Sequence, residues 1–398
     1  MEFDCDILIS GGGIAGLTAA AAFGTAGFDV ICVDPAPPIT DRDAVGADMR
    51  STAMLQPARK VLETAGVWDA LDADAAPLQI MRIVDAGGPD PVPRVTREFN
   101  AADVSDTPFG WNFPNWLLRR ALVARLDHLP CVDFRPDTGT TSLFTRTAGA
   151  RVGLTDGSRI TARLIIAADG RASPMREAAG IGVTTRRYGQ KALAFAVTHP
   201  VPHENVSTEI HRTGGPFTLV PLPDHDGLPC SAVVWMDDGP RQTMRADMDV
   251  AGFEAEMSTR SCHLFGPLSL VTPRNLWPII SQHAARLDGQ RLALIAEAAH
   301  VLPPIGAQGL NMSLGDIATL LTLADQNRGT FGDAAMLTAY HKARYSDVQL
   351  RVHGIDLLNR ASQASTPLAR DVRAAGLNAL YGLAPVRKML MQMGLGVR

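Results

Sequence analysis

Residues 5–16 of the chain read CDILISGGGIAG, an apolar run followed at once by four glycines. The apolar run from Cys5 to Ile9 predicts a buried strand, and the glycines at 11, 13 and 16 follow it directly. Residues 14–26 are rich in alanine and favour a helix, with Gly27 placed to end it. Residues 28–33 then predict a second strand, so the N-terminus begins with a strand-helix-strand unit of a Rossmann-like sheet.

The three glycines have the G-x-G-x-x-G spacing of a dinucleotide site. Gly11 permits the tight turn, Gly13 lets the backbone approach a pyrophosphate, and Gly16 allows the helix to pack on the sheet. The N–H groups of Ile14 and Ala15 lie at the positive end of the helix, where phosphates bind. Asp34 ends the second strand, where a carboxylate takes ribose hydroxyls and disfavours a 2′-phosphate.

Two later motifs distinguish the kinds of dinucleotide. Asp169 and Gly170 directly follow the apolar strand 164–168. Farther on, a buried strand ends at Ala296-Glu297, a proline- and glycine-rich loop follows at 303–307, and a helix begins near Gln308. Backbone N–H groups at such a helix start favour an electron-rich acceptor, and a reduced flavin carries negative charge at N1 and O2. The loop therefore indicates a flavin rather than a nicotinamide as the resident cofactor.

Length and composition exclude several classes of protein. The 398 residues suit two domains rather than one core, and 46% hydrophobic with 20% charged residues is typical of a folded globular protein. A net charge of −4 disfavours a general nucleic-acid-binding protein. The five cysteines are scattered and the histidines have no ligand spacing, so no metal site is expected. Without a transmembrane stretch or a basic leader, the protein is expected in the cytoplasm.

Together the three motifs resemble the class A flavoprotein hydroxylases of the para-hydroxybenzoate hydroxylase type, and most of all the ubiquinone-biosynthesis hydroxylases. The resemblance implies an α/β fold: a Rossmann-like FAD-binding domain, an inserted β-sheet substrate domain and a C-terminal helical segment. The expected boundaries are 1–75, 99–182 and 283–332 for the FAD domain, 76–98 and 183–282 for the substrate domain, and 333–398 for the helical segment. Helices are predicted at 52–71, 115–127 and 308–324, and strands between 190 and 282.

The resemblance also implies roles for single residues. Gly11, Gly13, Gly16 and Asp34 would hold the ADP half of FAD, Arg50 would lie along the flavin and pyrophosphate, and Asp169 would lie near the pyrophosphate. Asn115 is expected as a polar flavin contact. The residues expected to line the flavin ring are Pro304, Gly309, Leu310 and Asn311, of which the first three form the catalytic loop, with no acid or base assigned. The chain has Ala296-Glu297 where the family usually has Gly-Asp, and Glu297 is expected to take the acidic, ribityl-binding role.

The reaction implied is hydroxylation of an aromatic ring through a flavin C4a-hydroperoxide, with O₂ as co-substrate. NAD(P)H would be a transient reductant, because the chain has no second G-x-G-x-x-G motif after a strand. The implied substrate is a small lipophilic ring, a prenylated phenol of ubiquinone biosynthesis. Two alternatives remain at this point: a flavin reductase or dehydrogenase of the same fold that inserts no oxygen, and a non-catalytic FAD-bound scaffold in a biosynthetic complex.

The 190–282 sheet is expected to cover the flavin with apolar side chains and no cationic clamp for a carboxylated acid. The residues expected to supply this surface are Leu193, Phe195, Phe217, Leu219, Val234 and Trp235. His300 is interpreted as a packing histidine rather than a base. Tyr188 and Arg187 are candidates for handling the phenol proton.

The Met-rich stretch 383–393 carries Arg387 and Lys388 beside apolar residues. It predicts either a helix packed on its own domain or one that contacts a membrane surface or a partner of a biosynthetic complex. In the second case the protein would lie peripherally at the inner membrane.

Overall fold

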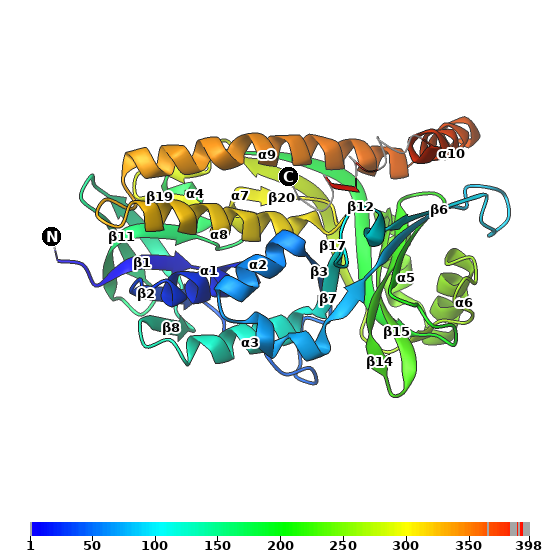
Figure 1. Ribbon diagram of the computed structural model, residues 1–398, viewed down its shortest axis with the longest axis horizontal. Helices are drawn as coiled ribbons and strands as arrows, with labels where there is room; N and C mark the ends of the chain where they lie inside the picture. Colours follow the sequence, from blue (N-terminus) through cyan, green and yellow to red (C-terminus); the bar gives the residue numbers. More distant parts are fainter. Residues whose placement is uncertain (1, 364–365, 383–387, 389–390, 393–398) are drawn as a thin grey trace.

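The computed structural model describes residues 2–363, 366–382, 388 and 391–392, and it contains two large sheets side by side, with helices around them (Figure 1). The first sheet has eight strands in the order β18-β19-β11-β1-β2-β8, with β10 and β9 added at β11. The strands of this sheet are β1 (Cys5–Ser10), β2 (Val30–Asp34), β8 (Val132–Pro136), β9 (Thr140–Thr145), β10 (Ala150–Leu154), β11 (Arg159–Ala167), β18 (Asp288–Gly289) and β19 (Leu292–Leu294).

The predicted strand-helix-strand unit is present at the centre of this sheet. β1 pairs in parallel with β2 on one side and β11 on the other, and α1 (Ile14–Thr25) connects β1 to β2. Gly27 has a φ of +81°, a left-handed conformation that glycine adopts without strain, and it reverses the chain after α1. Parallel strands place their carboxyl ends at one edge, so the segments after β1, β11 and β19 meet there.

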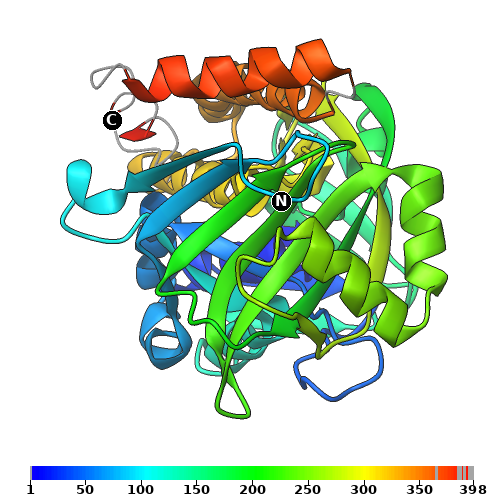
Figure 2. The same ribbon diagram turned by 90° about the vertical axis from the view of Figure 1, so that its right-hand side faces the viewer.

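The second sheet has nine strands in the order β20-β17-β12-β15-β14-β13-β5-β6, with β16 at β12. Helices α5 (Gly239–Asp247) and α6 (Val250–Arg260) cover the side that faces away from the first sheet (Figures 1 and 2). The strands are β5 (Ile80–Asp85), β6 (Val95–Asn100), β12 (Val183–Thr198), β13 (Val206–His211), β14 (Pro216–His225), β15 (Leu228–Asp238), β16 (Ser269–Leu270), β17 (Asn275–Ala284) and β20 (His300–Val301).

The expected apolar cover of the flavin is largely wrong. One buried core contains Leu193, Phe195, Phe217, Leu219 and Trp235 together with Phe253 and Met257 of α6, so these side chains point away from the first sheet. Successive strand residues point to opposite faces, and the sequence does not tell which face a helix will cover. Of the predicted set, only Val234 lies on the other face, where it packs against Ala192 and Met236.

A small third sheet lies between the two large ones, and one of its strands occupies residues that were predicted to be helical. It contains β3 (Ser51–Leu55), β7 (Gly110–Pro114) and β4 (Ala76–Leu78). The helix expected at 52–71 begins only at Gln56, as α2 (Gln56–Thr64), because the ring of Pro57 is tolerated in the first turn of a helix but not inside it. The helix expected at 115–127 is present as α3 (Asn115–Leu126).

Three helices at the C-terminal side complete the fold. α8 (Gln308–Gln326) packs on the first sheet, and the long α9 (Ala334–Ser362) runs past both sheets (Figure 1). α10 (Pro367–Gly382) lies beside β6, where Arg94 pairs with Asp371 at 2.9 Å (Figure 2). Most of the stretch 383–393 lies outside the described residues. The shorter helices are α4 (Pro174–Ala178), α7 (Ala296–Ala299), and the 3₁₀ turns at 68–70, 72–74 and 101–103.

Within the described residues, none of the helices combines the length and the apolar character that crossing a bilayer requires.

Candidate active site

Three glycines in the loop after β1 have different roles: two allow close packing of the backbone, and the third leaves free space beside it. Gly11 has a φ of +110°, and a Cβ there would lie 2.3 Å from the carbonyl oxygen of Ala168. A Cβ on Gly16 would lie 1.8 Å from the carbonyl oxygen of Gly11, so α1 could not pack so closely on the loop. A Cβ on Gly13 would meet nothing within 4 Å. Gly11 and Gly16 are therefore required by the fold, whereas the space above Gly13 is free for a ligand.

Asp34 lies against the same loop. Its Oδ2 accepts a hydrogen bond from the backbone N–H of Gly12 at 2.5 Å, and its Oδ1 accepts one from Ala36 at 2.9 Å. The carboxylate therefore fixes the position of the loop in this structure. Its expected contact with a ribose stays a prediction.

Arg50, directly before β3, is held by an ion pair with two hydrogen bonds to Asp48. Its Nε and Nη2 donate to the two oxygens of Asp48 at 2.8 and 2.7 Å. Burial alone would raise the pKa of Asp48, but the hydrogen bonds from Arg50 and Asn115 outweigh it and lower that pKa. The Arg50 guanidinium also lies 5.2 Å from the centre of the Trp277 ring in β17, so it connects the small sheet to the nine-stranded one.

Asn115 makes further hydrogen bonds to the residues around this ion pair. Its Nδ2 donates to Asp48 at 3.0 Å, its Oδ1 accepts from Thr52 at 2.8 Å, and its backbone N–H donates to the carbonyl of Arg50 at 2.7 Å. The structure thus gives Asn115 a bracing role. The expected flavin contact of its side chain stays a prediction.

Asp169 caps a helix at the carboxyl end of β11. Its Oδ1 accepts from the Ser173 hydroxyl at 2.5 Å and its Oδ2 from the Met175 N–H at 3.0 Å, and burial raises its pKa. The adjacent Gly170 has a φ of +83°, with nothing within 4 Å of a Cβ built there. Arg176 extends the network by donating to the carbonyl of Ala298 in α7 at 2.9 Å.

The Ala296-Glu297 pair lies where β19 turns into α7. Ala296 has a φ of +54°, a left-handed conformation that disfavours a residue with a Cβ. Glu297 has 52% of its side chain exposed, and its Oε2 lies 3.6 Å from Nε of Arg171. The carboxylate therefore reaches outward from the loop edge. Ala296, the residue before Glu297, therefore carries backbone strain that a glycine would avoid.

The loop before α8 is fastened by Asn311. Its Oδ1 accepts from the N–H of Leu55, and its Nδ2 donates to the carbonyls of Ala53 and Ala307 at 2.7 and 2.6 Å. This amide joins the loop to β3, and both of its polar atoms are hydrogen-bonded within the protein. Leu310 packs against the core of the first sheet, and a Cβ on Gly309 would meet nothing within 4 Å.

A buried network of charged and polar side chains connects α8, α9 and the segment after α7, and the sequence pattern did not predict it. Nε2 of His300 lies 2.7 Å from Oδ2 of Asp316, and Nε of Arg344 donates to Oδ1 of Asp316 at 2.8 Å. Asp316 also accepts from the N–H of Ala296 at 3.4 Å. The interpretation of His300 as a packing histidine agrees with its burial. The available signal was an aspartate beside Leu314 and Ile317 on the apolar face of a helix.

These residues fit an FAD. The open positions at Gly13 and Gly170 follow β1 and β11, which are parallel neighbours and end at the same edge, and the open position at Gly309 lies in the first turn of α8. The N-terminal ends of α1 and α8 have free N–H groups for a bound anion. Arg50 supplies a cation and Glu297 an exposed acceptor beside this edge. A bound FAD would rest on this edge and bring its redox chemistry to it.

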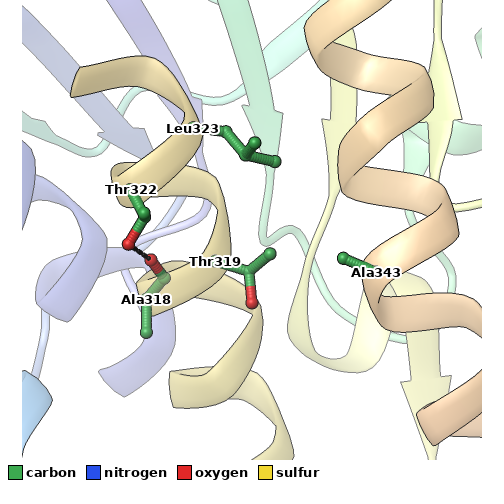
Figure 3. A pocket seen from close by; sticks show the side chains of 5 residues that line it. All are labelled: Ala318, Thr319, Thr322, Leu323 and Ala343. Carbon is green, nitrogen blue, oxygen red and sulfur yellow. Dashed lines mark hydrogen bonds between the residues drawn. The ribbon is translucent and has the colours of Figure 1, made fainter. Parts of the chain in front are cut away.

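A shallow hollow on the surface between α8 and α9 does not belong to this site. It is lined by Ala318, Thr319, Thr322, Leu323 and Ala343, and contains no charged side chain (Figure 3). The Thr322 hydroxyl donates to the carbonyl of Ala318, so its polar group is satisfied within α8.

Comparison with known proteins agrees with this geometry. A family described as FAD binding domain matches residues 4–353. The chain belongs to this family. A ubiquinone hydroxylase of Rhodospirillum rubrum, UbiL, is 32% identical over 394 residues, with 98% of this chain and 89% of the relative aligned. The 3-demethoxyubiquinol 3-hydroxylase of Escherichia coli is 27% identical over 98% of both chains.

Solved structures agree with the fold of this FAD-dependent hydroxylase. The p-nitrophenol 4-monooxygenase PnpA of Pseudomonas putida superposes with a TM-score of 0.80, over the full length of both chains at 19% identity. An aklavinone-11 hydroxylase in complex with FAD and aklavinone covers 93% of this chain and 71% of its own, with a TM-score of 0.71 at 20% identity. The predicted fold class, the resemblance to class A hydroxylases and the assignment as an FAD-dependent aromatic hydroxylase are confirmed, and neither alternative is favoured.

Proposed function

We propose that this hydroxylase acts on a prenylated phenol of ubiquinone biosynthesis, with NAD(P)H as its reductant. The observation that carries the substrate is the full-length similarity to two hydroxylases named for ubiquinone and demethoxyubiquinol. We also propose the domain boundaries predicted from the sequence. The FAD-binding domain comprises 1–75, 99–182 and 283–332, the substrate domain 76–98 and 183–282, and the helical segment 333–398.

The chain's own residues bind and orient the cofactor. The backbone at Gly13 and the N–H groups of Ile14 and Ala15 take the pyrophosphate, and Asp34 takes the ribose. Arg50, held by Asp48, faces the flavin side of the site, and Glu297 takes a ribityl hydroxyl. Since Asp34 and Arg50 are held by hydrogen bonds before binding, little ordering of these two side chains is needed when the cofactor arrives.

The loop 303–311 positions the reaction. When bound, FAD would take electrons from NAD(P)H and activate O₂, of which one atom enters the ring and the other leaves as water. The N–H groups at Gly309 and Leu310 lie in the first turn of α8, where they stabilise negative charge. Asn311 holds this turn against β3, and the exposed Pro304 of the loop would help to exclude water from the reacting atoms.

Oxygen incorporation tests the proposed reaction. The purified protein should oxidise NAD(P)H slowly alone and faster with a prenylated phenol, with one atom from labelled O₂ in the product. A product without the label would identify a reductase or dehydrogenase, and the absence of phenol-stimulated oxidation would identify a scaffold. Tight coupling to para-hydroxybenzoate, without turnover of any lipophilic phenol, would overturn the substrate. A deletion strain should accumulate the quinone precursor on which the enzyme acts.

A lipophilic substrate also calls for contact with a membrane surface. The solvent side of α9 carries the exposed residues Leu350, Leu357 and Leu358, and α10 carries Leu368 and Val372, which supports such a contact near the C-terminus. Removing residues from 383 onward, with the Arg387-Lys388 pair, should lower co-sedimentation with anionic liposomes and leave FAD bound. Unfolding on truncation would show instead that this segment is structural.

A further inference from the structure

The turn before α8 has a backbone conformation that needs support from other parts of the chain. Gly306 and Ala307 are consecutive residues with positive φ, of +63° and +54°. Ala307 carries a Cβ, and the left-handed conformation disfavours any residue that has one. Because the chain does not prefer this turn by itself, side chains elsewhere have to hold it in place.

Each of these two residues has its carbonyl oxygen bound by a side-chain amide. Nε2 of Gln308 donates to the carbonyl of Gly306 at 2.8 Å, and Nδ2 of Asn311 donates to the carbonyl of Ala307 at 2.6 Å. Asn311 is anchored on β3. Gln308 is anchored on α9, where its Oε1 accepts a hydrogen bond from Nη1 of Arg351. The turn is therefore held from two different elements.

Arg351 determines which way the Gln308 amide points. A guanidinium group has only N–H donors, so it binds the oxygen of the amide, and the amide nitrogen then faces the carbonyl of Gly306. Gln308 is only 8% exposed, so water competes little for these two positions. Without Arg351 the amide would lose the contact that fixes its orientation.

Arg351 is itself fixed by a row of charged side chains along one face of α9. Its Nε donates to Oδ1 of Asp347 at 3.1 Å, and Oδ2 of Asp347 accepts from Nη1 of Arg344 at 2.9 Å. Arg344 in turn donates to Asp316 of α8 at 2.8 Å. Residues 344, 347 and 351 share one face because they are three and four positions apart. The row thus connects the buried middle of α8 to the turn at its start.

The two bound carbonyls also determine where the neighbouring N–H groups point. In a trans peptide the N–H lies opposite the C=O, so the N–H groups of Ala307 and Gln308 point away from the amides that hold the turn. The next N–H groups, of Gly309 and Leu310, lie in the first turn of α8, which a helix leaves free. Donors at this positive helix end stabilise the negative charge that a flavin gains on reduction.

We propose that Arg351 is a positioning residue for the cofactor. Through the amide of Gln308 it fixes the turn 306–307, and this aims the free N–H groups at the start of α8 toward the reduced flavin. Asp316 and Asp347 balance the charges of Arg344 and Arg351, so the effect comes from orientation rather than from an added positive charge. The inference rests on the proposed placement of the flavin at the loop 303–311.

Arg351→Met and Gln308→Leu test this role in the FAD-bound enzyme, because each removes one link between α9 and the turn. Both should weaken binding of reduced FAD more than binding of oxidised FAD, by a factor of about three to ten. A reductive titration against a dye of known potential measures this ratio as a more negative reduction potential. If Arg351 acts through Gln308, the double variant should change the ratio no more than Gln308→Leu alone.

Lys342→Met is the matched control, because Lys342 is an exposed cation of the same helix. It should leave the ratio unchanged. Thermal melts of all the variants separate a loss of stability from a change of reduction potential. Additive changes in the double variant, or an unchanged ratio in both single variants, would overturn the inference.

Gly309→Val separates this inference from the placement of the flavin. A Cβ at Gly309 meets nothing within 4 Å, so the variant should fold, and its side chain should lower FAD affinity if the flavin lies at this loop. Loss of FAD in Gly309→Val, together with an unchanged ratio in Arg351→Met and Gln308→Leu, would refute only the role of Arg351. Full FAD affinity in Gly309→Val would refute the placement of the flavin and the role of Arg351 with it.

Discussion

Nε2 of His300 lies 2.7 Å from Oδ2 of Asp316, and neither side chain has any exposed surface. His300 follows α7, which carries Glu297, and Asp316 lies in the middle of α8, which begins at the flavin loop. The second oxygen of Asp316 accepts from Arg344 of α9. One buried carboxylate thus fixes three segments around the cofactor edge.

Asp316→Asn should destabilise the protein by about 3 kcal/mol or more, because it leaves His300 and Arg344 buried without their anion. Burial alone would raise the pKa of Asp316, but the attraction of His300 and Arg344 outweighs it and lowers that pKa. A lowered folded pKa means that the stabilisation is complete above the unfolded value of about 4 and is lost as the pH falls through the folded one.

Urea unfolding of the wild type and of Asp316→Asn, between acid and neutral pH, measures how the stabilisation by Asp316 depends on pH. The difference in free energy of unfolding should be constant near neutrality and narrow on acidification. Asp325→Asn, which changes an exposed aspartate of the same helix, should have little effect. A difference for Asp316→Asn that does not vary with pH would refute the electrostatic explanation.

Gly13→Val should fold normally and purify without yellow colour. No atom lies within 4 Å of a Cβ at Gly13, so the new side chain meets no protein, but it fills the approach of the pyrophosphate. Circular dichroism checks the fold, and flavin absorbance per chain checks binding. Gly182→Val, at another open glycine away from the loop, should retain one non-covalent FAD. A folded Gly13→Val protein with full FAD would show that the cofactor lies elsewhere.

Glu297→Ala should weaken FAD binding by about 1–3 kcal/mol, because the cofactor would cover a polar group that loses its partner. Glu297→Asp should have a milder effect, since it restores the residue usual in the family. Reconstitution of the apoprotein, followed by flavin fluorescence, gives the two dissociation constants. Equal affinity of wild type and Glu297→Ala would remove Glu297 from the site.

Ala296→Gly should raise the free energy of unfolding by about 0.5–1 kcal/mol. The left-handed conformation at Ala296 costs a residue with a Cβ roughly 1–2 kcal/mol, and the greater freedom of glycine in the unfolded chain offsets part of the gain. Thermal melts of the apoproteins measure the difference. Ala299 lies in the same short helix and has no positive φ, so Ala299→Gly should lower the free energy of unfolding. A similar decrease for Ala296→Gly would show that the backbone at Ala296 is not strained.

The Rossmann-like unit and the prediction of FAD came from the sequence alone, because the motifs that indicate them follow local rules of glycine spacing and strand and helix pattern. Gly16 has to be glycine because a Cβ there would clash with the nearby carbonyl of Gly11, and the φ of +110° at Gly11 is a second local reason for glycine. The composition of residues 304–308 likewise predicts the start of a helix. The tertiary structure was needed to show which face of β12 and β15 is covered by α6 and which is turned toward the first sheet. Strand alternation separates Ala194 from Phe195 but does not say which of them α6 will cover. The pairing of His300 with Asp316 and Arg344 likewise joins residues from three segments, and no local spacing encodes such a contact.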